Sequence, residues 1–289
     1  MINLVIFAPL MSKISAVTYK LKQYINYYKS AKTIYNIQSP SVFDIVTHIF
    51  DFSKQYYCFW KIEEQRKVLV QNQDEIEFIE LGAGSHKFNN HVSRKITDIA
   101  KSSLSSPHQG QILFNLANYF NAQNILEIGT SLGISTAYLA KANSQSKVIT
   151  VDGNNQVLQI AKNLFHNLSI ENIKVIHSEF DTFFSSLDSL SVPSFDLIFL
   201  DGNHAYEATI HYFYKLLPYF NANTIIVLDD IHWSAGMTKA WNELLNHNLV
   251  SLAIDYYDCG IIFLNNQLPN EKIAYIPFWK KPWRIGLFG

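Results

Sequence analysis

The stretch NILEIGTSLGIS, residues 124–135, decides the fold of this chain. An aliphatic run enters a loop with glycines at 129 and 133, and a helix-like stretch follows. A second aliphatic run, 147–151, then ends on Asp152. This order is typical of a βαβ unit that binds a ribose, because glycines let the backbone approach a ligand and a carboxylate can accept the ribose hydroxyls.

The alternation of strand-like and helix-like stretches continues beyond this unit. Further aliphatic runs lie at 172–176, 195–200 and 224–228, with amphipathic stretches between them. Only two residues separate the last pair of runs, 249–257 and 260–265, too few for a crossover helix. We therefore predict an α/β fold: a Rossmann-like, doubly wound sheet, mostly parallel, with a C-terminal antiparallel hairpin.

The rest of the chain suggests two further parts. Residues 1–105 show helical spacing without clear strands and predict an N-terminal helical extension before the main domain, 106–266. A helix is expected at about 13–32, with a basic face and tyrosines packed on the main domain; a membrane-surface or RNA contact is the alternative. Because Met11 opens a more ordinary start, residues 1–10 are expected to be dispensable. The aromatic and basic tail, 267–289, is expected to be a packed or interface segment.

Composition narrows the class of protein. The net charge of −1 gives no electrostatic footprint for nucleic acid, and 48% hydrophobic residues suffice for a large core. The two cysteines have no CxxC spacing, so no disulfide framework is expected and a cytoplasmic setting fits. The apolar first eleven residues are too short to span a bilayer.

A second glycine loop, ELGAGS at 80–85, competes with the first. A polar stretch follows it, and no aliphatic strand appears before 124. We therefore expect a structural turn outside the parallel sheet; a lid that contacts the acceptor is the alternative.

Acidic residues follow two of the predicted strands. Asp201 comes after 195–200, and Asp229 and Asp230 come after 224–228. The carboxyl ends of these strands should meet at one edge, where crowded carboxylates repel one another unless they are protonated or hold a cation such as Mg²⁺. Strand-end aspartates often cap the next helix, so the alternative is that Asp201 only contacts the bound cofactor and Asp229 is a buried cap.

Residues 106–265 resemble class I S-adenosylmethionine-dependent methyltransferases of the small-molecule O-methyltransferase type. LEIGTSLGIST (126–136), SPHQGQILFNLANYF (106–120) and VDGN (151–154) carry the resemblance. The family pattern has a glycine where this chain has Ser131, and catechol-type members also depart from the pattern there. The loop is not GxGxxG, which argues against NAD as the cofactor. SPSVFDIVTHIF (39–50) and VLDDIHW (227–233) also resemble a poorly characterised bacterial group of class I methyltransferases.

The resemblance implies a cofactor site for S-adenosylmethionine. Glu127 would hold the methionine amino group, Ser135 the carboxylate near a helix N-terminus, and Asp152 the ribose. Glu179 and Phe180 would lie by the adenine. The implied cofactor-binding residues are Glu127, Gly129, Thr130, Ser131, Gly133, Ser135, Asp152, Gly153, Glu179 and Phe180.

The acidic residues resemble the metal ligands of two O-methyltransferase types. Catechol-type enzymes use an acid and an acid–amide pair, and macrolide sugar-type enzymes use an acid and a double acid. The resemblance implies that Asp201, Asp229 and Asp230 hold Mg²⁺ or another divalent cation, with Asp201 and His204 catalytic. His204 lies where catechol-type enzymes carry a lysine base, and histidine suits neutral pH.

The predicted function is methyl transfer from S-adenosylmethionine to an oxygen of a small molecule or sugar. The alternatives are a class I methyltransferase that acts on nitrogen or RNA, and a non-catalytic binding protein that keeps the fold. The predicted partner is a small-molecule acceptor, with no clear nucleic-acid or membrane partner. A homodimer is left open.

Overall fold

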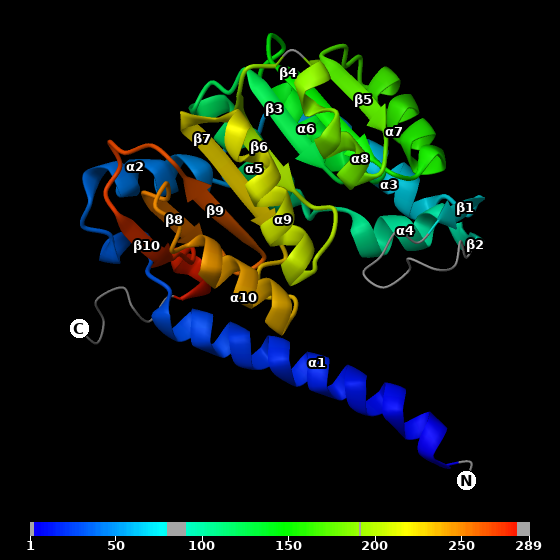
Figure 1. Cartoon of the computed structure of the whole chain (residues 1–289), viewed down its shortest axis with the longest axis horizontal. Coiled ribbons are helices and arrows are strands. Elements are labelled where there is room, and N and C mark those ends of the chain that lie inside the picture. Colours follow the sequence, from blue (N-terminus) through cyan, green and yellow to red (C-terminus); the bar gives the residue numbers. More distant parts are fainter. Residues whose placement is uncertain (1–2, 80–90, 191, 282–289) are drawn as a thin grey trace.

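A computed structural model of the chain describes residues 3–79, 91–190 and 192–281 (Figure 1). Its centre is an eight-stranded sheet in the order β10-β8-β9-β7-β6-β3-β4-β5. The strands of this sheet are β3 (Asn124–Ile128), β4 (Lys147–Asp152), β5 (Ile173–His177), β6 (Phe195–Leu200), β7 (Phe220–Asp229), β8 (Leu252–Asp255), β9 (Cys259–Phe263) and β10 (Glu271–Ala274).

The pairing of these strands confirms the predicted fold class. Strands β3 to β7 pair in parallel, whereas β9 runs antiparallel to both β7 and β8. The chain winds outward from β3 in one direction through β4 and β5, then in the other through β6 and β7. The sheet therefore has a topological switch point beside β3, where open α/β sheets bind ligands at the carboxyl ends of their strands.

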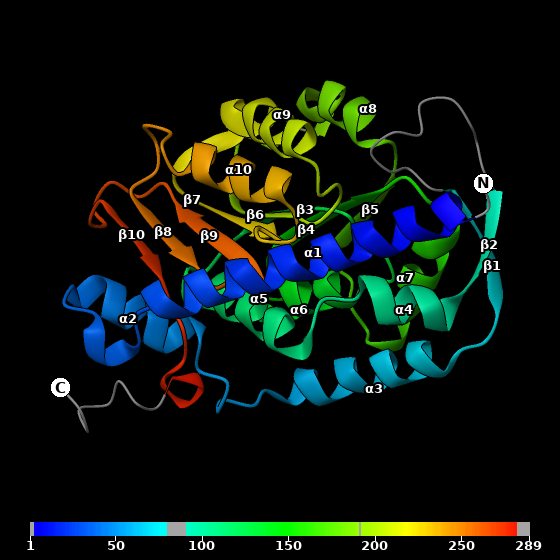
Figure 2. The same cartoon turned by 90° about the horizontal axis from the view of Figure 1, so that it is seen from below.

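Helices cover both faces of the sheet, as a doubly wound fold requires. Figures 1 and 2 show α8, α9 and α10 on one face and α2 to α7 on the other. The helices are α1 (Asn3–Ser30), α2 (Pro40–Ile49), α3 (Tyr57–Gln71), α4 (Ile96–Ser103), α5 (Pro107–Tyr119), α6 (Ile134–Ala142), α7 (Asn155–Asn167), α8 (Phe180–Ser185), α9 (Tyr206–Leu216) and α10 (Ala235–Leu244), with 3₁₀ turns at Ile34–Asn36, Leu187–Leu190, Leu217–Tyr219 and Phe278–Lys280.

Alternation along the strands explains why both faces are apolar. In β3, Ile125 packs into the cluster under α2 and α5, and Leu126 packs into the cluster under α9 and α10. Two helix starts follow directly from the sequence: Ser39 and Ser106 each accept a backbone N–H as N-cap, with proline at the next position.

Two features differ from the sequence predictions. The N-terminal part is not wholly helical, because β1 (Glu75–Ile79) and β2 (His91–Lys95) form a small antiparallel sheet. Strand β10 lies within the predicted tail and pairs in parallel with β8. The second glycine loop, 80–85, lies within residues 80–90, which are outside the described part of the chain. The expectation for this loop therefore stays a prediction.

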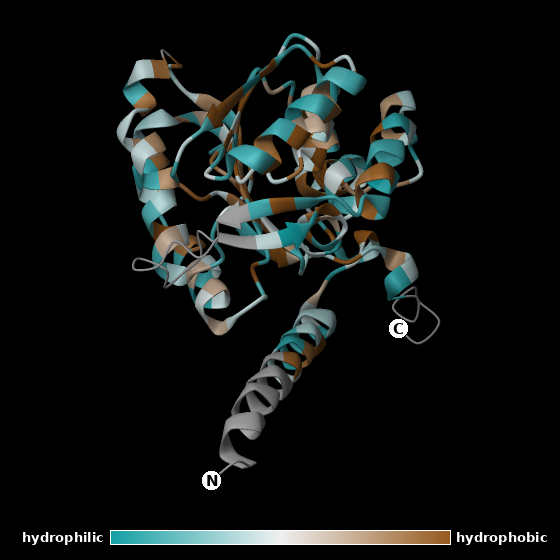
Figure 3. Cartoon of the chain, turned by 90° about the vertical axis from the view of Figure 1, so that its right-hand side faces the viewer, coloured by the Kyte–Doolittle hydropathy of each residue, from teal (hydrophilic) through white to brown (hydrophobic). Residues whose placement is uncertain are grey.

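Helix α1 passes beneath the carboxyl ends of the central strands (Figures 1 and 2) and extends away from the body of the fold (Figure 3). Residues from the far end of the chain hold its C-terminus. The Tyr27 hydroxyl donates to the carbonyl oxygen of Tyr275, and the buried Lys281 ammonium donates to the carbonyl oxygens of Tyr28, Lys29 and Ala31. A cation at a helix C-terminus is favourable, because it satisfies carbonyls that the helix leaves unpaired.

Two other expectations concern membranes and cysteines. Within the described ranges, no helix is both long and apolar enough to cross a bilayer. Cys58 and Cys259 are both free thiols.

Candidate active site

The loop between β3 and α6 is built from left-handed backbone. Gly129 has φ +103° and Gly133 has φ +85°, conformations in which a side chain is strained. A Cβ on Gly129 would overlap the backbone carbonyl of Asp201, and one on Gly133 would lie 2.8 Å from the Phe165 ring. The loop therefore lies directly against the start of the β6–α9 connection.

Glu127 is buried at the end of β3, below this loop. Its Oε2 accepts hydrogen bonds from the Thr136 hydroxyl at 2.5 Å and the Thr150 hydroxyl at 2.6 Å. Its Oε1 is buried and has no hydrogen-bond partner among the described residues. Burial raises the pKa of Glu127 to about 7, and the hydroxyls of Ser135, Thr136 and Thr150 act in the opposite direction. A buried acceptor without a partner fits a ligand that brings an N–H donor.

Asp152 ends β4 and fastens the glycine loop to that strand. Its Oδ2 accepts from the Ser131 N–H at 2.9 Å, and its Oδ1 accepts from the Asn154 N–H at 2.8 Å. Burial raises the pKa of Asp152, although these backbone N–H groups lower it. The buried Thr130 hydroxyl lies 2.6 Å from that of Thr150.

The other predicted cofactor residues lie around the same loops. Ser135 is buried in the first turn of α6, and the carbonyl oxygen of Gly153 lies 3.0 Å from the His177 Nε2. Glu179 is the exposed N-cap residue of α8. Phe180 packs against the connection after β6, where a Cβ on Gly202 would lie 2.5 Å from its ring.

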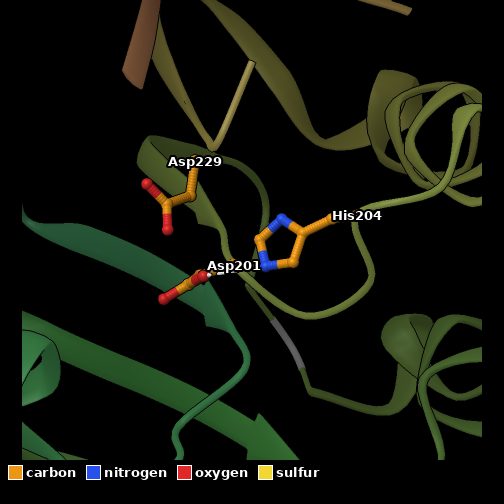
Figure 4. A group of neighbouring side chains, drawn as sticks. All are labelled: Asp201, His204 and Asp229. Atoms are coloured by element: carbon orange, nitrogen blue, oxygen red, sulfur yellow. Dashed lines mark ion pairs between the residues drawn. The ribbon is translucent and has the colours of Figure 1, made fainter. Parts of the chain in front are cut away.

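The acidic residues form a compact group with His204 (Figure 4). One ligand atom each of Asp201, His204 and Asp229 lies within 4.8 Å of the others. The His204 Nε2 is 3.5 Å from the Asp201 Oδ1 and 3.9 Å from the Asp230 Oδ2. The structure thus brings Asp201 and Asp229 together as predicted, but His204, not Asp230, completes the tight group. Asp230 lies beside it with left-handed backbone, φ +54°.

Electrostatics make this group a good cation site. Burial raises the pKa of Asp201 well above its ordinary value, and the adjacent Asp229 raises it further. Burial and Asp229 likewise raise the pKa of Asp230 to about 6. In the described ranges, neither Asp201 nor Asp229 forms an ion pair with lysine or arginine. Two neighbouring carboxylates without a compensating cation supply oxygen ligands that suit a divalent metal ion, and the His204 imidazole lies beside them.

Residues of α5 and α1 also contact the carboxyl edge of the sheet, and the sequence did not predict these contacts. The Gln109 side-chain amide, from α5, donates to Asp229. On α1, the Lys20 ammonium lies 2.9 Å from the centroid of the exposed Trp233 ring, and the Tyr19 hydroxyl donates to the Thr238 hydroxyl at 3.0 Å. Gln109 is one of several polar residues in α5, with His108, Gln111 and Asn115, so no sequence signal distinguished it. No local pattern connects α1 with residues more than 200 positions later.

His232 follows the acidic pair but faces elsewhere. Its Nε2 lies 2.8 Å from the Asp255 carboxylate, and its ring stacks on Tyr257 with centroids 5.3 Å apart. His232 therefore packs against the connection between β8 and β9, while Trp233 remains half-exposed at the carboxyl edge of the sheet.

Comparisons with known proteins agree with this geometry. A family model described as a methyltransferase domain matches residues 126–231. The chain is 30% identical over 135 residues to a catechol O-methyltransferase of Mycobacterium tuberculosis, covering 46% of this chain and 59% of that protein. It is 29% identical over 154 residues to an O-methyltransferase of Aspergillus hancockii, covering 50% and 58%. The chain spans 57–65% of the length of the curated relatives it matches.

Solved structures show the same fold. An O-methyltransferase of Bacillus cereus, in complex with S-adenosylhomocysteine, superposes with a TM-score of 0.54 at 18% identity, covering 77% of this chain and 96% of that one. The strand order and the glycine loop of this chain agree with the family match, because all three indicate a methyltransferase fold. Residues 126–231 are therefore similar to a methyltransferase domain, and the named enzymes among the curated relatives of this chain are O-methyltransferases.

Proposed function

We propose that this chain transfers the methyl group of S-adenosylmethionine to a hydroxyl oxygen of a small molecule, with a divalent cation held at the acidic group. The observation that carries the proposal is the direct contact between Gly129 and the backbone of Asp201. It makes the predicted cofactor loop and the carboxylates neighbours, so that a methyl donor and a bound hydroxyl would lie side by side.

The loop residues fit the cofactor. The unpaired Oε1 of Glu127 would accept from the methionine amino group, and Ser135 at the N-terminus of α6 would meet the carboxylate. The glycines at 129 and 133 allow the left-handed turns that bring the loop against Asp201 and Phe165, where a side chain would not fit. Asp152 would accept from the ribose hydroxyls.

The acidic group fits a cation such as Mg²⁺, with Asp201 and Asp229 as ligands and Asp230 beside them. When bound, S-adenosylmethionine supplies an electrophilic methyl group, and a divalent cation supplies positive charge that lowers the pKa of an acceptor hydroxyl.

The chain's own residues would move the proton. His204 accepts the proton of the acceptor hydroxyl, and Asp201, 3.5 Å away, stabilises the resulting imidazolium. Helix α1 lies at this edge of the site, where its Lys20 contacts Trp233. The acceptor would be a small molecule or a sugar.

The test combines binding and turnover. Calorimetry should show one S-adenosylhomocysteine per chain, with binding lost in the Glu127→Ala, Asp152→Ala double variant. Methyl transfer from labelled S-adenosylmethionine to catechol should require Mg²⁺ and stop in EDTA. Retained binding in the double variant would contradict the cofactor site, and activity after exhaustive chelation would contradict the metal. A homodimer and a cytoplasmic location also remain predictions, which light scattering and cell fractionation would check.

A further inference from the structure

A second hollow lies against α3 and shares no residue with the glycine loop or the acidic group. It is an open hollow of about 350 Å³, and small-molecule pockets have volumes of roughly 300–1,000 Å³. The residues that line this aromatic hollow are Gln55, Tyr56, Tyr57, Phe59, Trp60, Glu63 and Gln111.

Two exposed rings form its most prominent feature. Tyr57 and Trp60, three positions apart at the start of α3, are 75% and 59% exposed. Their ring centroids are 6.5 Å apart and their planes are inclined by 36°. Rings this close leave no slot for a ligand between them. They form instead one broad apolar platform that a ring-shaped ligand can cover.

A buried amide lies beside the platform. Gln111, on α5, is 9% exposed, and its Oε1 is buried without a hydrogen-bond partner in the part of the chain that the structure describes. An unsatisfied buried acceptor costs about 1–3 kcal/mol, so a ligand that brings a donor would be favoured. Gln111 lies two positions beyond Gln109, which faces the acidic group, so α5 separates the two sites.

The one charged residue that lines the hollow is already paired. Glu63 is its one charged lining residue, and its carboxylate accepts from the Arg66 Nε at 2.8 Å and the Tyr138 hydroxyl at 2.9 Å. The Lys61 ammonium already lies 4.8 Å from the Tyr57 ring centroid, so a cationic ligand would be repelled there. A neutral ligand is therefore favoured over a cation.

We propose that the aromatic hollow binds a neutral carbohydrate ring. A pyranose has an apolar face of C–H groups, which would lie on Tyr57 and Trp60, and a rim of hydroxyls, one of which would donate to the Gln111 Oε1. This site is independent of methyl transfer, because it uses none of the residues assigned to the cofactor or the cation.

Saturation-transfer NMR of the full chain tests the site with methyl glycosides of glucose, galactose, mannose and N-acetylglucosamine as probes. At least one should bind, with saturation strongest on the ring protons of one face. Trp60→Ala should weaken that binding about tenfold, the order expected for loss of an aromatic stacking partner, and Gln111→Leu should also weaken it. Trp279→Ala removes another half-exposed tryptophan and should leave binding unchanged.

The outcomes separate the explanations. Circular dichroism spectra like that of the wild type would show that each variant is folded, and Trp60→Phe, which keeps an aromatic face, should retain binding. If no glycoside binds, or if binding is equal in Trp60→Ala and the wild type, the proposal is wrong. Tighter binding of adenosine or choline that depends on Trp60 would likewise overturn the assignment to a carbohydrate.

Discussion

Asp201 is a buried carboxyl group, and its ionised form reduces the stability of the metal-free protein. Burial and the neighbouring Asp229 both raise the pKa of Asp201, so the ionised form is unfavourable without a cation. Groups that a binding site requires commonly reduce the stability of the empty protein. The cost should therefore be measurable when the charge is removed.

Asp201→Asn should stabilise the metal-free protein at pH 8. We expect a rise in Tm of about 2–4 °C, which corresponds to roughly 1 kcal/mol in a chain of this size. Because the pKa of Asp201 is raised by folding, its folded form favours the proton. Its contribution to stability is therefore present at low pH and is lost as the pH rises through the folded pKa. The gain should accordingly shrink as the pH is lowered toward 4 in thermal melts with EDTA.

The same variant should lose methyl transfer and Mg²⁺ binding. Asp196→Asn is a matched control outside the site, and it should not raise Tm, because Asp196 accepts two backbone N–H groups at the start of β3. An Asp201→Asn protein that melts lower than the wild type at pH 8 would show that the carboxylate is stabilising.

His204→Gln should lower kcat by about 100-fold or more, the contribution usual for a general base. The Kd for S-adenosylhomocysteine should stay within about twofold of the wild type, because His204 is not among the proposed cofactor residues. His211→Gln is the control: this histidine lies on α9 and pairs with Asp181 at 3.2 Å, away from the acidic group. Equal rates for His204→Gln and the wild type would rule out the base.

At the scale of elements, the glycine loop depends on two backbone conformations. Gly129→Ala should abolish S-adenosylhomocysteine binding and destabilise the fold by about 1–3 kcal/mol, because φ is +103° and the new Cβ would meet the Asp201 carbonyl. Gly236→Ala, in the first turn of α10, has its nearest neighbour at 3.5 Å and should be neutral or slightly stabilising. Urea unfolding and calorimetry measure both variants, and equal losses for the two would contradict this reading of the loop.

The central elements were predictable because their signals are local. The aliphatic run 124–128, the glycines and Asp152 lie within about 30 residues, and each determines its own strand, turn or helix. The hairpin of β8 and β9 followed from its short connection. The meeting of Asp201 and Asp229 followed from the rule that parallel strands end at one edge.

Elements that depend on distant partners were missed. The sequence EIEFI of β1 alternates polar and apolar residues, but its partner β2 is polar and lies beyond a long connection. The four-residue β10 is a strand because β8 offers it a free edge. Asp230 has left-handed backbone, which its residue type does not predict, and the tight group consists of Asp201, Asp229 and His204.

At the scale of the whole molecule, we expect Lys281 to anchor the C-terminus of α1 to the rest of the fold. Lys281→Met keeps the apolar bulk but leaves the carbonyls of Tyr28 and Ala31 without their donor, so unfolding free energy should fall by about 1–3 kcal/mol. Amide exchange in the described C-terminal half of α1 should accelerate about tenfold, while the central sheet stays protected.

Lys272→Met is the matched surface control, since its ammonium contacts only the exposed Asn246 side chain at 3.1 Å among the hydrogen bonds described. It should change stability by less than about 0.5 kcal/mol. Unchanged exchange in α1 of Lys281→Met would show that the tyrosine contacts suffice to hold the helix.

The same clamp has a consequence during synthesis on the ribosome. Tyr27 and Ala31 emerge 248 and 250 residues before their partners Tyr275 and Lys281. At a synthesis rate of about 5–20 residues per second, roughly 10–50 s pass between the synthesis of α1 and that of the residues that hold it. The strands that carry the glycine loop and the acidic group are made within this interval. The helix beneath the site is thus secured only once residues 275–281 have been made, and a nascent chain interrupted before residue 275 would expose the tyrosines of α1 to chaperones and proteases.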